Sequence, residues 1–178
     1  MKRIPVSIVN VTTDADIDIA LSKSSNEKRV SFDLDEVVFC SDEVCEKKPF
    51  LLPGSLNKEC IRLGMPALCH YLISQGYDLW VYTQKYNSDD YIRYFLKAYH
   101  IPVSGVITGY SRKRWKKNDL NKQIEKKIMN KYKRTLNITG EEIIKIEGGD
   151  FEQYDLGCDA PDWSKSVIHI IKSWNDEQ

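Results

Sequence analysis

Residues 29–39 read RVSFDLDEVVF, and this stretch decides the fold. A short apolar run ends there in two aspartates, Asp33 and Asp35, that stand one residue apart. Such a run is typical of a strand that is buried within a parallel sheet and reaches the edge of the sheet where charge is needed. The stretch therefore predicts a buried strand with two carboxylates at its carboxyl end.

Strand and helix patterns alternate on the C-terminal side of this stretch. Helical spacing runs from Leu63 to Ser74 and ends near Gly76, a residue type that favours helix ends. The apolar run at 77–83 predicts the next strand, and a helix capped within 87–89 runs to about His100. The remaining expected elements are a strand over 103–109, a helix over 119–134, a turn over 137–140, and strands over 142–150 and 166–174.

This alternation predicts one α/β domain over residues 1–178: a three-layer, doubly wound, Rossmann-like parallel sheet of about five strands. Residues 1–28 are expected to form an N-terminal β extension, because the apolar residues from Ala15 to Leu21 alternate with residues that are mostly aspartates. The edge of that strand is a candidate site for pairing with a second copy in a homodimer.

Composition narrows the class of protein. The chain has 178 residues, of which 42% are hydrophobic, enough for one domain with its own core. No apolar run approaches about 18 residues, so we expect no membrane-spanning helix, and we recognise no secretory leader. Five cysteines without a CxxC pair favour free thiols in a reducing cytoplasm and disfavour a zinc site.

Polar residues stand at three of the expected strand ends. They are Asp33 and Asp35, then Thr83 and Gln84, and finally Asp150 with Asp155 five residues on. In parallel α/β sheets, ligands bind outside the carboxyl ends of the strands. Because several acids buried together need a cation, we expect a hard divalent ion with oxygen ligands, and Mg²⁺ fits best.

These residues carry a family resemblance. SFDLDEVVF (31–39), LWVYTQ (79–84) and IIKIEGGDFEQYD (143–155) resemble the first, second and fourth motifs of the haloacid-dehalogenase-like (HAD) phosphatases. The third motif is a single lysine, for which RKRWKKNDLNK (112–122) offers candidates in the right order. The resemblance covers roughly residues 29–172.

The resemblance implies a phosphomonoester hydrolase in which Asp33 attacks phosphorus to give an aspartyl-phosphate. Asp35 would act as general acid and then as general base. Thr83 and Gln84 would bind the phosphoryl oxygens. Asp33, the Asp35 backbone carbonyl and Asp150 would hold Mg²⁺, with Asp155 binding through water or orienting the other ligands.

The active-site lysine is the least determined of these residues. Lys117 precedes the expected start of the helix at 119, and the HAD pattern has its lysine near the beginning of this helix. Three other lysines remain candidates: Lys113, Lys116 and Lys122. About two dozen residues, 40–62, are left for a lid, so the resemblance implies a small-capped or capless enzyme.

Charge is unevenly distributed along the chain. Residues 111–134 carry eleven Lys or Arg and two acids, although the formal net charge of the chain is zero. The segment is either a solvated helix face or a surface for nucleic acid or another phosphorylated macromolecule. Two rival functions also stay open: a HAD-like binding module with little catalysis, and a phosphotransferase with an acceptor other than water.

Overall fold

The computed structural model shows a mixed α/β fold, and it describes residues 12–40, 45–49, 59–85, 88–109, 119–140, 142–148, 150–155 and 163–176. Its elements are α1 (Asp14–Ser22), β1 (Lys28–Asp33), the π-helical turn η1 (Leu34–Val38), α2 (Met65–Ser74), β2 (Tyr77–Tyr82), α3 (Asp89–Ala98), β3 (Gly105–Ile107), α5 (Asp119–Lys131), β4 (Arg134–Ile138), β5 (Glu142–Glu147), β6 (Asp150–Asp155) and α6 (Trp163–Asp176).

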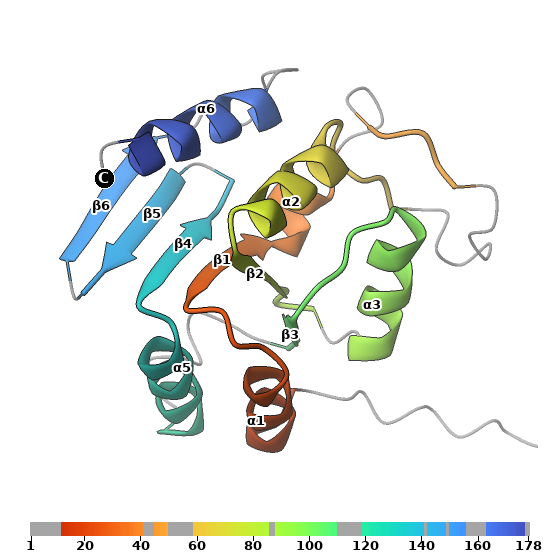
Figure 1. The fold of residues 1–178 in the computed structure, drawn as a ribbon. Helices are drawn as coiled ribbons and strands as arrows, with labels where there is room; N and C mark the ends of the chain where they lie inside the picture. The colour runs from red at the N-terminus through yellow and green to blue at the C-terminus, as the bar shows by residue number, and fades with distance from the viewer. Residues whose placement is uncertain are drawn as a thin grey trace, which may run out of the picture.

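One six-stranded sheet runs in the order β3-β2-β1-β4-β5-β6 (Figure 1). The strands from β3 to β4 are parallel, whereas β5 and β6 are antiparallel to their neighbours. Helices α2 and α6 lie on one side of the sheet and α1 and α5 on the other. The predicted α/β class is confirmed, with β1 inside the sheet.

Each face of the sheet has its own core, because successive strand residues point to opposite faces. On β2, Leu79 and Val81 join the larger core, which also takes side chains from α2, α3 and α6. Trp80 joins the smaller core against α1 and α5. The central strands are thereby covered on both sides.

The prediction of an N-terminal β extension is wrong for the residues that the structure describes. Residues 14–22 form helix α1, which begins with a capping box between Thr13 and Asp16. This box satisfies backbone N–H groups that a strand would have had to pair elsewhere, and Ile17 and Ala20 are buried at helical spacing. The strand edge expected to pair in a homodimer therefore does not exist, and residues 1–11 lie outside the described chain.

Two elements near the C-terminus also differ from expectation. Residues 163–176 form helix α6 rather than a strand over 166–174, with Trp163, Val167 and Ile171 buried four residues apart on its inner face. The first two residues of the expected turn over 137–140 belong to β4, and α5 ends at Lys131. The apolar runs were ambiguous between strand and helix, and burial of one stripe decided for a helix.

Strand β5 runs antiparallel to β4, although it was expected to be parallel. The link between Ile138 and Glu142 is three residues long. A parallel neighbour needs a crossover of a dozen or more residues, so a link this short permits only a hairpin.

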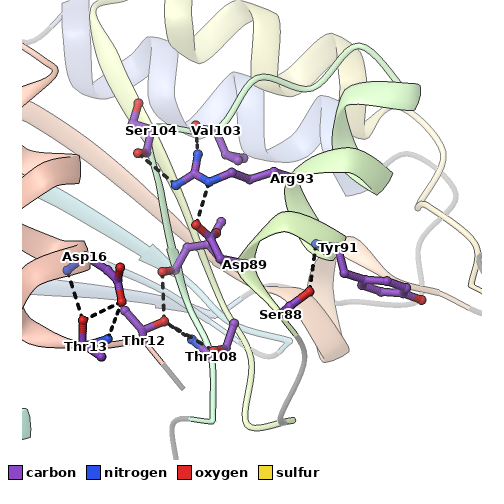
Figure 2. Close-up of polar contacts among 11 residues, drawn as sticks. Thr12, Thr13, Asp16, Ser88, Asp89, Tyr91, Arg93, Val103, Ser104 and Thr108 are labelled. Carbon is purple, nitrogen blue, oxygen red and sulfur yellow. Dashed lines mark hydrogen bonds and ion pairs between the residues drawn. The ribbon is translucent and has the colours of Figure 1, made fainter. Parts of the chain in front are cut away.

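Polar side chains hold the loops at the β3 edge of the sheet (Figure 2). Arg93 on α3 pairs with Asp89 at 2.9 Å and donates to the Val103 carbonyl at 2.7 Å. Thr12 accepts a hydrogen bond from the Thr108 amide at 2.9 Å. The segment before α1 thus contacts the residue that follows β3.

None of the helices that the structure describes is long and apolar enough to cross a membrane.

Gly105 is a position where packing admits no side chain. A Cβ there would lie 2.3 Å from the Trp80 ring. That ring cannot easily move aside, because its indole N–H donates to the Tyr132 hydroxyl at 3.0 Å, which in turn donates to Asp78 at 2.7 Å. We expect Gly105→Ala to cost stability near the upper end of the about 1–3 kcal/mol that overpacking costs.

Urea unfolding followed by circular dichroism measures this loss. Gly148→Ala is the matched control, because φ is +56° there and a Cβ would meet open space. Only the left-handed backbone penalty, about 1 kcal/mol, applies to the control. Equal losses in the two variants would contradict the packing argument.

Candidate functional site

Asp33 ends β1 and begins the turn that follows it. Its side chain is 6% exposed, and Oδ1 accepts hydrogen bonds from the amides of Asp35 at 2.8 Å and Glu36 at 3.0 Å. Asp33 is therefore the N-cap residue of η1. The cap satisfies two backbone donors and directs the chain away from the sheet.

Burial raises the pKa of the Asp33 carboxyl above its usual value. The two amide hydrogen bonds act in the opposite direction, and the neighbouring charges of Glu36 and Asp35 add to the rise. The fold thus holds an acid whose charged form is partly desolvated. Perturbed acids of this kind are enriched at functional sites.

Asp35, Thr83 and Lys85 form one connected group beside Asp33. The Thr83 hydroxyl donates to Asp35 Oδ2 at 2.6 Å, and Lys85 Nζ lies 2.8 Å from Asp35 Oδ1. The Lys85 amide also donates to the Thr83 hydroxyl oxygen at 3.0 Å. Because β1 and β2 are parallel neighbours with Asp33 opposite Tyr82, their carboxyl ends bring these residues together, as predicted for Asp33, Asp35 and Thr83.

The loop after β2 is held by the loop after β3. The Thr83 amide donates to the Ile107 carbonyl at 2.9 Å, and the Gly109 amide donates to the Lys85 carbonyl at 2.9 Å. Thr83 is fully buried, so its hydroxyl has a fixed position. These bonds connect the candidate site to the Thr12–Thr108 contact at the same edge of the sheet (Figure 2).

Asp150 does not lie beside Asp33, and this expectation is wrong. The register pairs Asp150 with Glu147, Glu147 with Arg134, and Arg134 with Lys28, the first residue of β1. Its backbone therefore lies at the far end of the sheet, roughly 17–20 Å along a strand of this length. The physical reason is the antiparallel direction of β5.

Asp155 lies at the same end of the sheet as Asp33 but on the distant edge strand. It pairs with Glu142, three strands away from β1, roughly 14 Å at the usual strand spacing. On the side of β1 away from β2, the parallel neighbour is β4, and β4 is followed by Thr139 and Gly140. Two alternating buried residues, Leu136 and Ile138, were the signal in the sequence for this strand.

Lys85 is a functional candidate that the sequence reasoning missed. The sequence predicts the cation within 112–122, whereas Lys85 stands two residues after Thr83 in the same loop. Its pKa is raised, chiefly by its hydrogen bond to Asp35. Lys117, Lys113 and Lys116 lie outside the described residues, and the Lys122 side chain is exposed on α5.

Several cations of the basic segment already have partners in this chain. Lys127 on α5 pairs with Asp14 at 2.7 Å and with Asp18 at 2.8 Å, both on α1. Lys131 donates to the Ser24 carbonyl at 2.6 Å. Where the structure describes the segment, Lys127 and Lys131 thus contact α1 and the residues that follow it, in addition to any solvent they face, and nucleic-acid binding stays a prediction.

The expected lid over 40–62 is described only in part, at 40, 45–49 and 59–62. Its C-terminal end contacts the turn that carries the acids: Arg62 donates to the Val37 carbonyl at 2.8 Å and to the Glu36 carbonyl at 3.1 Å. Arg62 therefore satisfies carbonyls that η1 leaves free at its end.

The donor set suits a magnesium ion only partly. Among the described residues there is no group of three or more His, Cys, Asp or Glu side chains arranged to hold a metal. Asp33 and Asp35 do stand at one edge, and Mg²⁺ in enzymes commonly uses one or two carboxylates and completes its shell with water and substrate phosphate. The two aspartates therefore fit a magnesium site that the substrate completes.

A cavity of about 220 Å³ lies on the α5 side of the sheet. Its walls combine polar side chains of β1 and β4 with isoleucines of β5, and Gln84 and Thr139 line it at the candidate site's end of the sheet. The predicted phosphate ligand Gln84 is exposed and lies beside this cavity. No hydrogen bond of Gln84 to Asp33 or Asp35 is present among the described contacts.

The buried carboxyl of Asp33 predicts a pH-dependent stability. Its pKa is higher in the folded than in the unfolded state, so wild-type stability falls as pH rises through the window between the two values. Asparagine keeps the N-cap oxygen without the charge. We expect Asp33→Asn to be more stable than wild type at pH 7, with the difference shrinking toward acid pH.

Urea unfolding from pH 7 down to the acid limit of the native state measures this difference. Asp90→Asn, the same substitution at an exposed residue of α3, is the control and should stay within about 0.5 kcal/mol of wild type. A less stable Asp33→Asn at pH 7 would mean that the carboxylate is better stabilised than its burial implies.

Comparison with known proteins gives no family assignment. No family model and no curated protein matches the chain. A crystal structure of the C-terminal domain of the coenzyme A biosynthesis bifunctional protein CoaBC aligns with 86% of this chain and 98% of that one, at 9% identity and a TM-score of 0.24. A similarity this low carries no argument about function.

Proposed function

We propose that this chain is a Mg²⁺-dependent phosphomonoester hydrolase that acts through Asp33. The observation that carries the proposal is the meeting of Asp33, Asp35 and Thr83 at the carboxyl ends of two central parallel strands, with the Thr83 hydroxyl 2.6 Å from Asp35. The resemblance of residues 31–39 and 79–84 to the first two HAD motifs supports the same assignment.

In the proposed reaction, an Asp33 carboxylate oxygen attacks phosphorus and the bond to the leaving oxygen breaks. Asp35 gives that oxygen its proton, then accepts a proton from the water that cleaves the aspartyl-phosphate and releases inorganic phosphate. Amide hydrogen bonds to Oδ1 orient Asp33 and leave Oδ2 for attack. Mg²⁺ held by the Asp33 carboxylate and the Asp35 backbone carbonyl would offset the phosphoryl charge, which leaves the Asp35 carboxyl for proton transfer.

Thr83 and Lys85 would bind the phosphoryl group. Both contact Asp35, so a phosphoryl group that enters beside Asp33 competes for the same donors. The Lys85 side chain is 57% exposed and flexible enough to turn from Asp35 toward the phosphoryl oxygens. Among the described residues, Lys85 is the cation proposed to offset the phosphoryl charge. Lys117 remains the residue predicted to match the lysine of the third HAD motif.

A binding module with little catalysis is the second candidate. It is favoured by the separation of Asp150 from Asp33 and by the Thr139-Gly140 pair after β4, because these leave two carboxylates together rather than three. Such a module would still bind phosphorylated partners through Thr83 and Lys85. Turnover separates the two candidates, and added alcohol acceptors separate hydrolysis from phosphotransfer.

A cytoplasmic location belongs to the same proposal. The four cysteines that the structure describes form no disulfide bond, as a reducing compartment favours.

Hydrolysis of a generic aryl phosphate, with and without Mg²⁺, tests the proposed activity. We expect metal-dependent turnover in wild type and none in Asp33→Asn, because the nucleophile is lost while the N-cap is kept. Asp35→Asn should lower kcat by about 10²–10⁴-fold. Binding of inorganic phosphate without turnover in wild type would favour the binding module instead.

Lys85 is tested by replacing its charge. Lys85→Ala should lower kcat/KM by about 10²-fold, the typical loss when one charge-stabilising donor is removed. Lys97→Ala is the matched control, because Lys97 is exposed in the last turn of α3, away from the two strand ends. Unchanged kinetics in Lys85→Ala would limit Lys85 to the ion pair with Asp35 and direct the search to Lys117.

A further inference from the structure

Two cysteines lie in contact just beyond the turn that carries the acids. The sulfur atoms of Cys40 and Cys45 are 2.8 Å apart. Both residues are half-buried, so small solutes reach them. A disulfide bond is about 2.05 Å long, so the two sulfurs need to approach by less than about 1 Å to form one.

Backbone hydrogen bonds hold both cysteines against one short segment, residues 60–62. The Cys40 amide donates to the Cys60 carbonyl at 3.1 Å, and the Glu46 amide donates to the Ile61 carbonyl at 2.8 Å. Cys45 itself forms an antiparallel bridge with Arg62. The pair is therefore positioned by contacts on both of its sides rather than by chance approach of two free side chains.

The other described cysteines are less accessible. Cys60 is 4% exposed, and Cys69 lies in the larger core, where burial raises its pKa to about 12. A thiol with so high a pKa forms almost no thiolate at neutral pH, and the thiolate is the reactive form. Among these four residues, the Cys40–Cys45 pair combines access with proximity.

We propose that Cys40 and Cys45 are a redox modification site that forms a reversible intramolecular disulfide when the protein reacts with a peroxide. This inference does not depend on the proposed phosphatase activity, because it rests on the two sulfurs and their surroundings alone.

The chemistry balances with hydrogen peroxide as the oxidant. The thiolate of one cysteine attacks a peroxide oxygen, the O–O bond breaks, and a sulfenic acid and water form after proton transfer. The second sulfur then attacks the sulfenic sulfur, the S–S bond forms, and a second water leaves. Two thiols are oxidised, one peroxide is reduced to two waters, and a small dithiol reverses the step by exchange.

The disulfide would join Cys40, which lies just after η1, to Cys45, which forms the β-bridge with Arg62. Arg62 in turn donates to the carbonyls of Glu36 and Val37 in η1. Oxidation therefore acts on the segment that follows η1 and contacts it through Arg62.

The experiment uses the full chain, reduced and freed of reductant, then treated with a small excess of hydrogen peroxide. Free thiols are alkylated, and the digest is analysed by mass spectrometry. We expect the peptide that holds Cys40 and Cys45 to lose the mass of two hydrogen atoms, to escape alkylation, and to regain both thiols with dithiothreitol. Cleavage after Glu43 should leave its two halves linked.

Variants separate this bond from other oxidation products. Cys45→Ser should abolish the linked peptide and leave Cys40 as a sulfenic acid that dimedone traps, whereas Cys69→Ala and Cys60→Ser should keep the linked peptide. A Cys40–Cys60 link, oxidation of both cysteines to sulfinic acids, or no change in wild type would each overturn the proposal. Far-UV circular dichroism of each variant confirms that it is folded.

Discussion

The candidate site depends on one buried carboxylate, that of Asp33 at the carboxyl end of the central strand β1. It accepts hydrogen bonds from the amides of Asp35 and Glu36. Asp33 is thereby both the last residue of β1 and the N-cap of η1. This turn places Asp35 within hydrogen-bond distance of Thr83, which directly follows the neighbouring strand β2. The same burial that gives the cap its strength raises the pKa of Asp33, so the structural role and the proposed catalytic role come from one environment.

Hydrogen bonds connect the end of β1 and the turn η1 to the neighbouring loops. The loop with Thr83 and Lys85 is bonded to the loop after β3, and that loop is bonded to Thr12 (Figure 2). On the other side of η1, Arg62 satisfies two carbonyls of the turn. The acids are thus supported by backbone groups from several elements, which is the arrangement that holds polar side chains of a functional site in fixed positions.

How far the sequence predicted this site is clearest for two strand ends. Asp33 and Thr83 were predicted at adjoining ends because each follows a continuous apolar run, and two such runs joined by a helix form parallel neighbours. The same reasoning gave the wrong position for Asp150, because an apolar run does not show in which direction its strand runs. Lys85 was missed although it adjoins Thr83, since a single lysine in a loop has no periodic signal and only its 2.8 Å contact with Asp35 identifies it.

The α/β class, the buried strands β1 and β2 and the acids at the end of β1 could be predicted from the amino-acid pattern, because apolar periodicity and helix-capping residues act over short distances along the chain. The pattern left three features open: the helix over 163–176, the reversed direction of β5, and the contact between Cys40 and Cys45. Those outcomes depend on which surface each segment buries and on how short its link is, and both are properties of the packed molecule.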